Sequence, residues 1–306
     1  ARDGRENPEN AERKSSRLEP LRKLGCVVDV HYSWDCLRQL HEAQGAGFPV
    51  CVDSVLVPSG TPPELMALAR EVAPTTYVVE PGLFAAEFAQ DVPWASGGPE
   101  TAEEAAQRAT TALAAGGRSM WRRFEGGAAQ STCRFAVGCP TSMPLDQMKP
   151  PFVVFDGLSS ASNVGQVLRT AYHLGVNSVV ASPEAWSCLN GRASRVSMGW
   201  MYRMSFHMAD PLPATIVALK ELGVRVYAAE NQFSRPVMPH QPLGDRRWAL
   251  VVGSEGHGVS PEVVEMCDER ICVPQQQGHS LNVAHATSIC LYELSKHNVM
   301  SQATER

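Results

Sequence analysis

The sequence predicts an α/β protein whose C-terminal half is built around a parallel sheet, and three observations carry this prediction. After residue 151, short continuous apolar strands alternate with helical segments, which is typical of a parallel sheet covered by helices on both faces. The 306 residues, 44% of them hydrophobic, are enough for two domains with a core each. No apolar run approaches the roughly 20 residues that span a bilayer, so a soluble globular protein is expected.

The N-terminal part is expected to contain a polar arm and a small α/β domain. Residues 1–24 lack an apolar period, as is typical of a flexible or partner-dependent arm. Residues 25–140 are predicted to form the small domain from alternating short strands and helices. Its strands are expected at 51–57, 76–79 and 134–139, and its helices at 62–72 and 82–89.

Two segments of different composition follow. Residues 93–130 are rich in Ala and Gly, and three glycine pairs interrupt them, so we expect an insertion in the small domain with one helix at 102–115. Residues 141–151 contain three prolines. Because proline interrupts both helices and strands, this segment is expected to be the interdomain linker.

Residues 152–306 are predicted to form the larger domain. Its strands are expected at 152–155, 178–181, 224–229 and 248–252, and its helices at 163–174, 213–222 and 282–297. Ligands of open parallel sheets bind beyond the carboxyl ends of the strands. The loops that follow Phe155, Val252 and Val273 are therefore where a site is expected.

Each of these loops carries side chains that fill a core poorly but form hydrogen bonds well. The first leads into a helix with Asn163 and Arg169, the second has three glycines around Glu255, and the third contains Ser280 and Asn282. Taken singly, these residues are ordinary helix caps and turn glycines. No loop has a full dinucleotide or phosphate-loop fingerprint. The occurrence of all three loops at one sheet edge favours a ligand site of another kind.

In this order, the three loops resemble the motifs of the SpoU family of RNA ribose 2′-O-methyltransferases, within the SPOUT superfamily. The motifs are Asn163-x-Gly165-x-x-x-Arg169-x-Ala171, Gly253-x-Glu255-x-x-Gly258 and Ser280-Leu281-Asn282-Val283. The resemblance covers residues 150–297 closely. More loosely, residues 26–92 with 134–139 are similar to the small substrate-binding domain of ribosomal-protein L30e type. The resemblance implies a C-terminal trefoil knot and a homodimer with the site at its interface.

The resemblance also implies S-adenosylmethionine as cofactor and structured rRNA or tRNA as substrate. The residues expected in catalysis are Asn163, Arg169, Glu255, Ser280 and Asn282. Those expected around the cofactor are Gly253, Ser254, Glu255, Gly256, Gly258, Val273, Pro274, Gln275, Ser280, Leu281, Asn282 and Val283. Arg169 is expected to contact RNA together with Arg192, Arg195 and Arg203, whose spacing gives a locally basic strip.

The role of Arg169 follows from its chemistry. The family assigns this arginine the abstraction of the ribose proton, but a guanidinium has a pKa above about 12 and is a poor base. A neighbouring phosphate favours the cation further. We therefore expect Arg169 to act as an electrostatic clamp on the RNA phosphate and on the developing alkoxide. Asn163 and Glu255 are expected to hold Arg169 or the ribose.

Composition limits the remaining possibilities. The net charge of −5 argues against a protein that coats nucleic acid over its whole surface. Nine cysteines, an odd number without two-residue spacing, predict free thiols, no cysteine-bound metal and a reducing compartment. That compartment is expected to be the cytoplasm or an organelle matrix after removal of a presequence.

Two alternatives to an active methyltransferase remain open at this stage. One is an RNA-binding ribosome-assembly factor that keeps the fold without turnover, to which the polar arm and the Ala/Gly-rich insertion could both belong. The presence of all five polar positions favours retained catalysis. The other is a nucleotide-dependent oxidoreductase, which the missing dinucleotide fingerprint disfavours.

Overall fold

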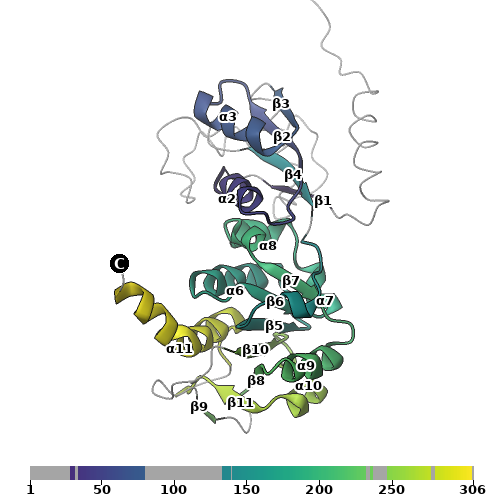
Figure 1. Cartoon of the computed structure of the whole chain (residues 1–306), viewed down its shortest axis with the longest axis vertical. Helices are drawn as coiled ribbons and strands as arrows, with labels where there is room; N and C mark the ends of the chain where they lie inside the picture. The colour runs from purple at the N-terminus through teal and green to yellow at the C-terminus, as the bar shows by residue number, and fades with distance from the viewer. Residues whose placement is uncertain are drawn as a thin grey trace, which may run out of the picture. The chain divides into compact units, whose positions relative to one another are not determined.

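The computed structural model of the chain describes residues 28–31, 34–79, 133–138, 140–231, 235–236, 247–276 and 280–304 (Figure 1). They fall in two compact units, one within residues 1–45 and 50–138 and the other within residues 46–49 and 139–306, and each is described by itself. The expected polar arm, the Ala/Gly-rich insertion and the helices predicted at 82–89 and 102–115 lie outside the described residues.

The N-terminal unit is a four-stranded sheet with two helices. The strand order is β1-β4-β2-β3, in which only β2 and β3 pair in parallel. The elements are β1 (Val28–His31), α2 (Trp34–Gly45), β2 (Val52–Pro58), α3 (Pro63–Val72), β3 (Thr75–Val79) and β4 (Arg134–Gly138). Pro63 begins α3, where a missing N–H costs nothing. Leu37, Leu40, Val55 and Phe135 are fully or almost fully buried in its core.

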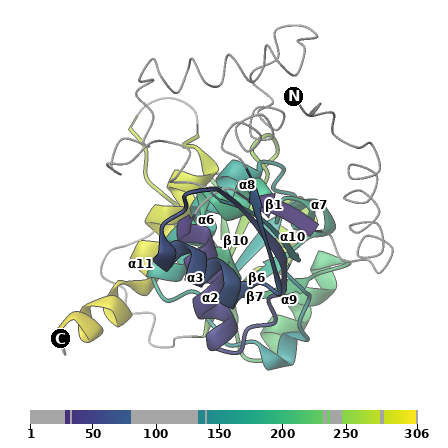
Figure 2. The ribbon, with the colours of Figure 1, turned by 90° about the horizontal axis from the view of Figure 1, so that it is seen from above.

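The C-terminal unit is a seven-stranded sheet in which every neighbouring pair is parallel (Figures 1 and 2). Its order is β7-β6-β5-β10-β8-β11-β9. The strands are β5 (Phe152–Asp156), β6 (Ser178–Ala181), β7 (Ser205–Met208), β8 (Arg225–Ala229), β9 (Arg235–Pro236), β10 (Trp248–Gly253) and β11 (Glu269–Cys272). All six residues of β10 are buried, as expected of a strand covered on both faces.

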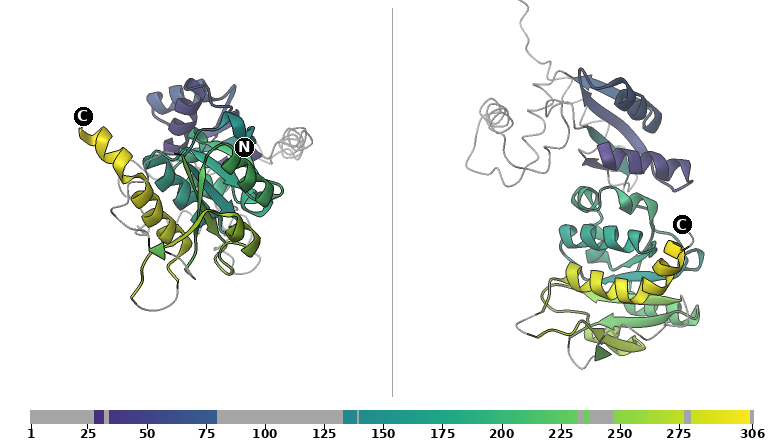
Figure 3. Two further views of the ribbon diagram at one scale, coloured as in Figure 1. Left: turned by 60° about the horizontal axis from the view of Figure 1, so that its bottom comes forward. Right: turned by 90° about the vertical axis from the view of Figure 1, so that its left-hand side faces the viewer.

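Helices cover both faces of this sheet (Figure 3). They are α6 (Ala161–His173), α7 (Pro183–Ser187), α8 (Gly191–Val196), α9 (Leu212–Glu221), α10 (Pro261–Met266) and α11 (Val283–Thr304), with the short 3-10 helices η4 (Leu145–Gln147) and η5 (Trp200–Arg203). Ile216 of α9 and Val263 of α10 share a core cluster with Val154 of β5. Because strand side chains alternate, the buried Val153 and Phe155 belong to the opposite face, on the side of α6 and α11.

The strand order places a topological switch between β5 and β10. From β5 the chain builds outward through β6 to β7, then crosses to β8 and returns to β10 beside β5. In open α/β sheets the loops at the carboxyl side of such a switch form the ligand crevice. The loops after β5 and β10 are therefore where a ligand is expected to bind.

The segment expected to be a linker packs on the C-terminal unit instead. The Met143 amide donates to the Phe206 carbonyl at 2.7 Å, and the Ser142 hydroxyl accepts from the Met208 amide at 3.0 Å. Met143 also packs against the core cluster, and Met148 belongs to it. Residues 142–148 thus lie along the edge strand β7. The composition of this segment did not predict the packing, because the contact with β7 is a β-bridge of a single residue pair, Ser142 with Phe206. The prolines of the segment suggested a linker instead.

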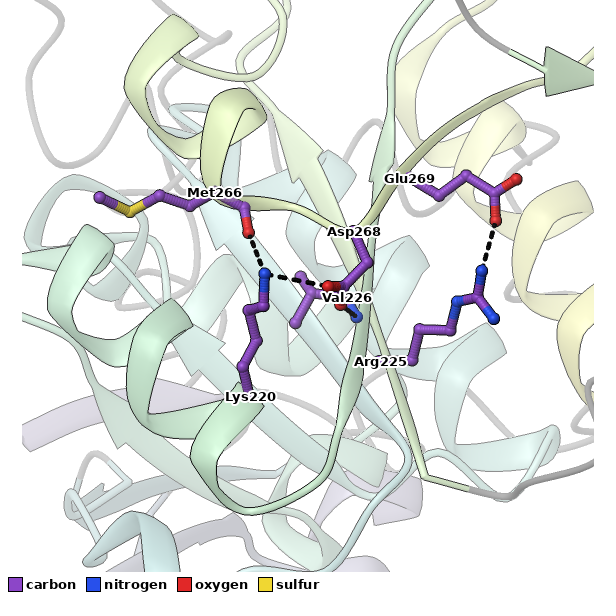
Figure 4. A network of polar contacts seen from close by, with 6 residues as sticks. All are labelled: Lys220, Arg225, Val226, Met266, Asp268 and Glu269. Carbon is purple, nitrogen blue, oxygen red and sulfur yellow. Dashed lines mark hydrogen bonds and ion pairs between the residues drawn. The ribbon is translucent and has the colours of Figure 1, made fainter.

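The amino edge of the sheet, opposite the switch loops, is fastened by a polar network (Figure 4). Lys220 Nζ lies 2.9 Å from Oδ1 of Asp268, and Asp268 Oδ2 accepts from the Val226 amide at 2.8 Å. Arg225 pairs with Glu269 at 3.3 Å. Partial burial raises the pKa of Asp268, but the hydrogen bonds and Lys220 outweigh it and lower the pKa overall. This network joins α9, β8 and β11 at the edge of the sheet opposite the loops that follow β5 and β10.

The predicted fold class is confirmed, and the predicted elements within the described residues lie at their expected places. The sequence patterns did not reveal β1, α2, α7, α8, β7 and α10. Most of these elements have four to six residues, too few to show a period. The trefoil knot stays a prediction.

Candidate active site

Side-chain hydrogen bonds join the three switch-edge loops. Asn163 lies in the first turn of α6, where its backbone N–H donates to the side-chain oxygen of the capping Ser160 at 3.3 Å. Its Nδ2 donates to Oε1 of Glu255 at 2.6 Å, and its Oδ1 accepts from Nδ2 of Asn282 at 3.3 Å. Oδ1 of Asn282 accepts in turn from the Ala284 amide at 2.9 Å. One directional chain of hydrogen bonds therefore connects the three loops and ends on a carboxylate.

Glu255 lies exposed in the loop after β10 and accepts from the loop after β5 twice. Besides Asn163, the Ser159 hydroxyl donates to its Oε2 at 3.4 Å. Partial burial raises the pKa of Glu255, but the hydrogen bonds from Asn163, its own backbone and Ser159 outweigh this and lower the pKa below its ordinary value. The carboxylate is ionised at neutral pH and is held across the switch point.

The three glycines of the second loop serve different purposes. A Cβ on Gly253 would lie 1.9 Å from the carbonyl carbon of Gly258, so only glycine lets the two ends of the loop meet. Gly258 has φ +70°, and its Cβ would lie 2.6 Å from Oε2 of Glu230. A Cβ on Gly256 would meet no heavy atom within 4 Å. Of the three, Gly256 is the position where a ligand could approach the backbone.

The first motif combines a packing residue with hydrogen-bonding ones. A Cβ on Gly165 would lie 2.7 Å from the Ala193 carbonyl oxygen and 2.8 Å from Cβ of Val196. Gly165 therefore allows α6 to pack closely on α8 and does not face a ligand. Asp156, at the end of β5, accepts from the Ser260 amide at 2.7 Å, which fastens the far end of the second loop to the first.

Arg169 lies exposed on α6, and within the described part of the chain it has no hydrogen-bond or ion-pair partner. Asn163 and Glu255, which are expected to hold Arg169 or the ribose, bond each other, and that they hold the ribose stays a prediction. Arg169 lies six residues after Asn163, which turns it away from that face of the helix. Its guanidinium is thus unpaired among the residues that the structure describes.

The other arginines of the expected RNA strip come from two elements that pack on α6. Arg192 and Arg195 lie exposed on α8, and Nε of Arg192 donates to the Ser162 hydroxyl at 2.6 Å. Arg203 ends η5 and is half-buried. Residues 157–209 contain these four arginines and a single acidic residue, Glu184. A chain with net charge −5 therefore has one locally basic segment around α6.

Most of the described residues of the third loop are open to solvent. Val273 is half-buried, whereas Pro274 and Gln275 are exposed, as are Ser280 and Leu281 after the residues that are not described. Asn282 combines two functions, since one end of its amide caps α11 and the other bonds Asn163. The expectation of a helix cap at Asn282 is thus met, while its role as a site residue stays a prediction.

Sequence reasoning missed Glu230. It directly follows β8, which lies between β10 and β11 in the sheet, so its carboxylate lies at the same edge as the three loops. Its amide donates to the Ile271 carbonyl at 3.0 Å, and its Oε1 accepts from the Asn231 amide at 2.8 Å. The rule used for the other loops, that ligands bind beyond carboxyl ends of strands, applied equally to the loop after Ala229.

Two findings on the described residues bear on other kinds of site. No group of three or more His, Cys, Asp or Glu side chains gathers there in a way that could hold a metal ion. None of the helices in this part of the chain combines the length and apolar character needed to cross a bilayer.

Comparison with known proteins agrees with the arrangement of the loops. Among curated proteins, an uncharacterized tRNA/rRNA methyltransferase of Mycobacterium bovis is 32% identical over 146 residues, which are 47% of this chain and 51% of that protein. The 23S rRNA (guanosine-2′-O-)-methyltransferase RlmB of Bordetella pertussis is 31% identical over 159 residues, 52% of this chain and 64% of RlmB. The chain thus spans about half to nearly two-thirds of the length of these relatives.

Among solved structures, the SpoU methyltransferase AviRb from Streptomyces viridochromogenes, in complex with AdoMet, superposes with a TM-score of 0.64. The match covers 92% of this chain and 93% of AviRb at 18% sequence identity, which establishes a common fold for both units. The sequence profile of the SpoU rRNA Methylase family matches residues 150–292, which include all three loops. Residues 150–292, which make up most of the C-terminal unit, are therefore similar to the SpoU rRNA methylase family.

Proposed function

We propose that this protein transfers a methyl group from S-adenosylmethionine to a ribose 2′-hydroxyl of structured rRNA or tRNA. The observation that carries the proposal is the hydrogen-bond chain Asn282–Asn163–Glu255, which joins the three motif loops at the switch point of the sheet. Exposed Arg169 lies on the helix that begins there. The similarity to methyltransferases of the SpoU family supports the same reaction.

The residues at the switch edge fit S-adenosylmethionine. The open side of Gly256 leaves its backbone accessible, and the exposed loop around Gln275 offers backbone groups that can read an adenine edge. The carboxylate of Glu230, beside Gly258, suits the hydroxyls or the positive charge of the cofactor. AviRb was crystallised with AdoMet. Besides these, Gly253, Ser254, Glu255, Gly258, Val273, Pro274, Ser280, Leu281, Asn282 and Val283 are proposed to surround the cofactor.

The work of the protein in this reaction is positioning. When bound, the cofactor would supply an electrophilic methyl group: the ribose oxygen would bond to the methyl carbon in line as the carbon–sulfur bond breaks, so that the thioether leaves and the hydroxyl proton passes to solvent. The chain must therefore hold the ribose hydroxyl behind that methyl group and stabilise the negative charge that grows on the oxygen. Arg169 has the permanent charge and planar donors for this role, together with a phosphate contact. Asn163 and Glu255 act by fixing the loops, and Ser280 and Asn282 complete the third loop.

RNA is proposed to bind along α6, α8 and η5. Arg169, Arg192 and Arg195 are exposed there, Arg203 borders them, and residues 157–209, which contain all four, include a single acidic residue. Such a local strip attracts phosphates even on an acidic protein.

A homodimer through α11 is proposed as the working form. Ile289 and Tyr292 of α11 are 41% and 51% exposed, and their spacing of three residues places them on one face of the helix. Leu281, which is 39% exposed, lies just before the helix begins. Exposed apolar residues in a row mark a contact surface. Light scattering on the purified protein tests this proposal, and Tyr292→Glu is expected to give monomers.

The protein is proposed to work in a reducing compartment. Burial raises the pKa of Cys267 and Cys290 to about 12, and seven cysteines within the described part of the chain are free thiols. Buried thiols with a raised pKa are poorly reactive, and they can remain free without forming a disulfide.

The test of the proposed function is methyl transfer from radiolabelled S-adenosylmethionine to total RNA, followed by mapping of the 2′-O-methylated positions. A labelled position that appears only with the wild-type protein supports the proposal. Binding of RNA without any transfer, by a folded protein that binds the cofactor, would instead favour an RNA-binding assembly factor.

A further inference from the structure

An aromatic cluster lies on the surface next to Arg169. Tyr172 of α6 and Trp200 of η5 are stacked, with ring centroids 4.6 Å apart and planes inclined by 25°. The guanidinium carbon of Arg203 lies 5.5 Å from each of these two centroids. His173 packs its ring edge on Trp200 at 4.9 Å. Two aromatic faces, an imidazole and a guanidinium are therefore gathered in one place.

The cluster shares a helix face with the arginine proposed to act in the reaction. Tyr172 and His173 follow Arg169 by three and four residues, the spacing at which helix side chains are neighbours. Partial burial and the charge of Arg169 lower the pKa of His173, which agrees with their proximity. An RNA nucleotide that touches Arg169 therefore has the aromatic cluster within reach.

The cluster differs from the aromatic core of the same unit. Trp248 and Tyr227 are 2% and 1% exposed, whereas Tyr172, Trp200 and Arg203 are each half-buried. Large apolar rings that remain partly exposed while others fill the core are available for contact. None of the residues of α6, α8 and η5 is acidic, so no carboxylate of these elements repels a phosphate next to the rings.

We propose that Tyr172, Trp200 and Arg203 form a stacking site for an unpaired RNA base near the methylated nucleotide. The inference rests on the proposed function and names the part of the substrate that this surface recognises. Proteins bind unpaired bases by stacking them on aromatic rings and on guanidinium planes, with the backbone held by cations. Here the rings and Arg203 supply the stacking surface, and Arg169, Arg192 and Arg195 supply the charges for the backbone.

The experiment compares two RNA probes of equal charge. Fluorescence anisotropy measures the binding of a labelled twelve-residue oligoadenylate and of a twelve-residue abasic ribose-phosphate oligomer. The wild-type protein is expected to bind the first more tightly by about fivefold to a hundredfold, the range of one stacked base. Trp200→Leu is expected to lose most of this preference, because it removes the stacking surface and leaves the charges in place.

Matched controls come from the same unit. Trp186 is also half-buried and packs edge-on against Phe206, but no arginine lies over its ring among the described cation contacts, so Trp186→Leu is expected to keep the preference. Arg203→Gln is expected to weaken it. Arg225 lies at the opposite edge of the sheet (Figure 4), where its guanidinium carbon is 5.6 Å from the centroid of the Tyr227 ring, and Arg225→Gln is expected to have no effect. If Trp200→Leu does not fold, the comparison of Arg203→Gln with Arg225→Gln tests the stacking site.

The outcomes separate this inference from the proposed function. Cofactor binding by calorimetry and the melting temperature serve as folding controls for each variant. If the wild type binds both oligomers equally, or if Trp200→Leu and Trp186→Leu behave alike, the stacking site is overturned even when methyl transfer to total RNA is intact. If the wild type transfers no methyl group but prefers the base-carrying oligomer, the proposed function fails and the stacking site stands.

Discussion

Nδ2 of Asn163 donates to Oε1 of Glu255 at 2.6 Å, across the point where the strand order of the larger sheet reverses. The two residues are 92 positions apart in the chain, and Asn163 is 8% exposed. Because the second end of the Asn163 amide accepts from Asn282, its side chain is the central link between three loops. The expected effects of substitutions follow from which link each one breaks.

The first expectation concerns Arg169 and rests on the proposed function. Arg169→Ala should lower methyl transfer by about a hundredfold or more, the scale expected when a preorganised charge at a developing anion is removed. Cofactor affinity should stay nearly unchanged, because no hydrogen bond ties Arg169 to the described loop residues. Single-turnover rates on the cognate RNA, at saturating cofactor, measure the effect.

Arg169→Lys is the control for charge. Lysine keeps the cation but lacks the planar fork of donors, so it should recover only part of the rate. Full activity of Arg169→Ala would show that Arg169 is an ordinary surface charge of the helix.

The substitution Asn282→Ser should distinguish the two roles of the Asn282 side chain, which caps α11 and bonds Asn163. Serine is a good N-cap residue but is too short to reproduce the reach of the Asn282 amide to Asn163. The free energy of unfolding should therefore change by less than about 1 kcal/mol, while cofactor affinity falls about tenfold, the equivalent of a lost hydrogen bond of 1.4 kcal/mol. Denaturant unfolding and calorimetry give the two quantities, and a loss of stability without a loss of affinity would leave Asn282 as a cap only.

Glu255→Gln should change how stability depends on pH. The pKa of Glu255 is lowered in the folded protein, so its ionised form stabilises the fold above the unfolded pKa of about 4.3. That contribution is lost as the pH falls from there through the lower folded pKa. Because Glu255 is exposed and solvent screens its contacts, we expect the wild type to lose no more than about 0.5 kcal/mol beyond the loss of Glu255→Gln between pH 7 and acid. Parallel dependence of both proteins on pH, in urea titrations, would contradict the lowered pKa.

Two glycines of the motifs should respond to alanine in opposite ways. Gly165→Ala places a Cβ 2.7 Å from a backbone oxygen of α8, and overpacking of this kind costs about 1–3 kcal/mol. Gly256→Ala meets nothing within 4 Å, so stability should change by less than about 0.5 kcal/mol while cofactor affinity falls. Melting temperatures and calorimetry on both variants provide the comparison. Unchanged cofactor binding by Gly256→Ala would remove that backbone from the proposed site.

The sequence by itself determined the class of the fold and the places of chemistry. The continuous apolar runs at 152–155 and 248–252 could only be buried strands, and polar residues after such strands had to lie at one edge of the sheet. The order of the three motifs supplied the family. Local patterns carry this information because the period of a strand or helix and the residues that end it are written in neighbouring positions.

Only the tertiary structure decided what these residues touch. The pairing of Asn163 with Glu255, the closeness of Gly165 to α8 and the position of Glu230 at the same edge all depend on contacts between segments far apart in the chain. The stack of Tyr172 on Trp200 is of the same kind. No local period encodes such contacts, because each is set by the crossing of packed elements and by the strand order. The strand order brings the loop after β5 beside the loop after β10, and that neighbourhood assembles the site.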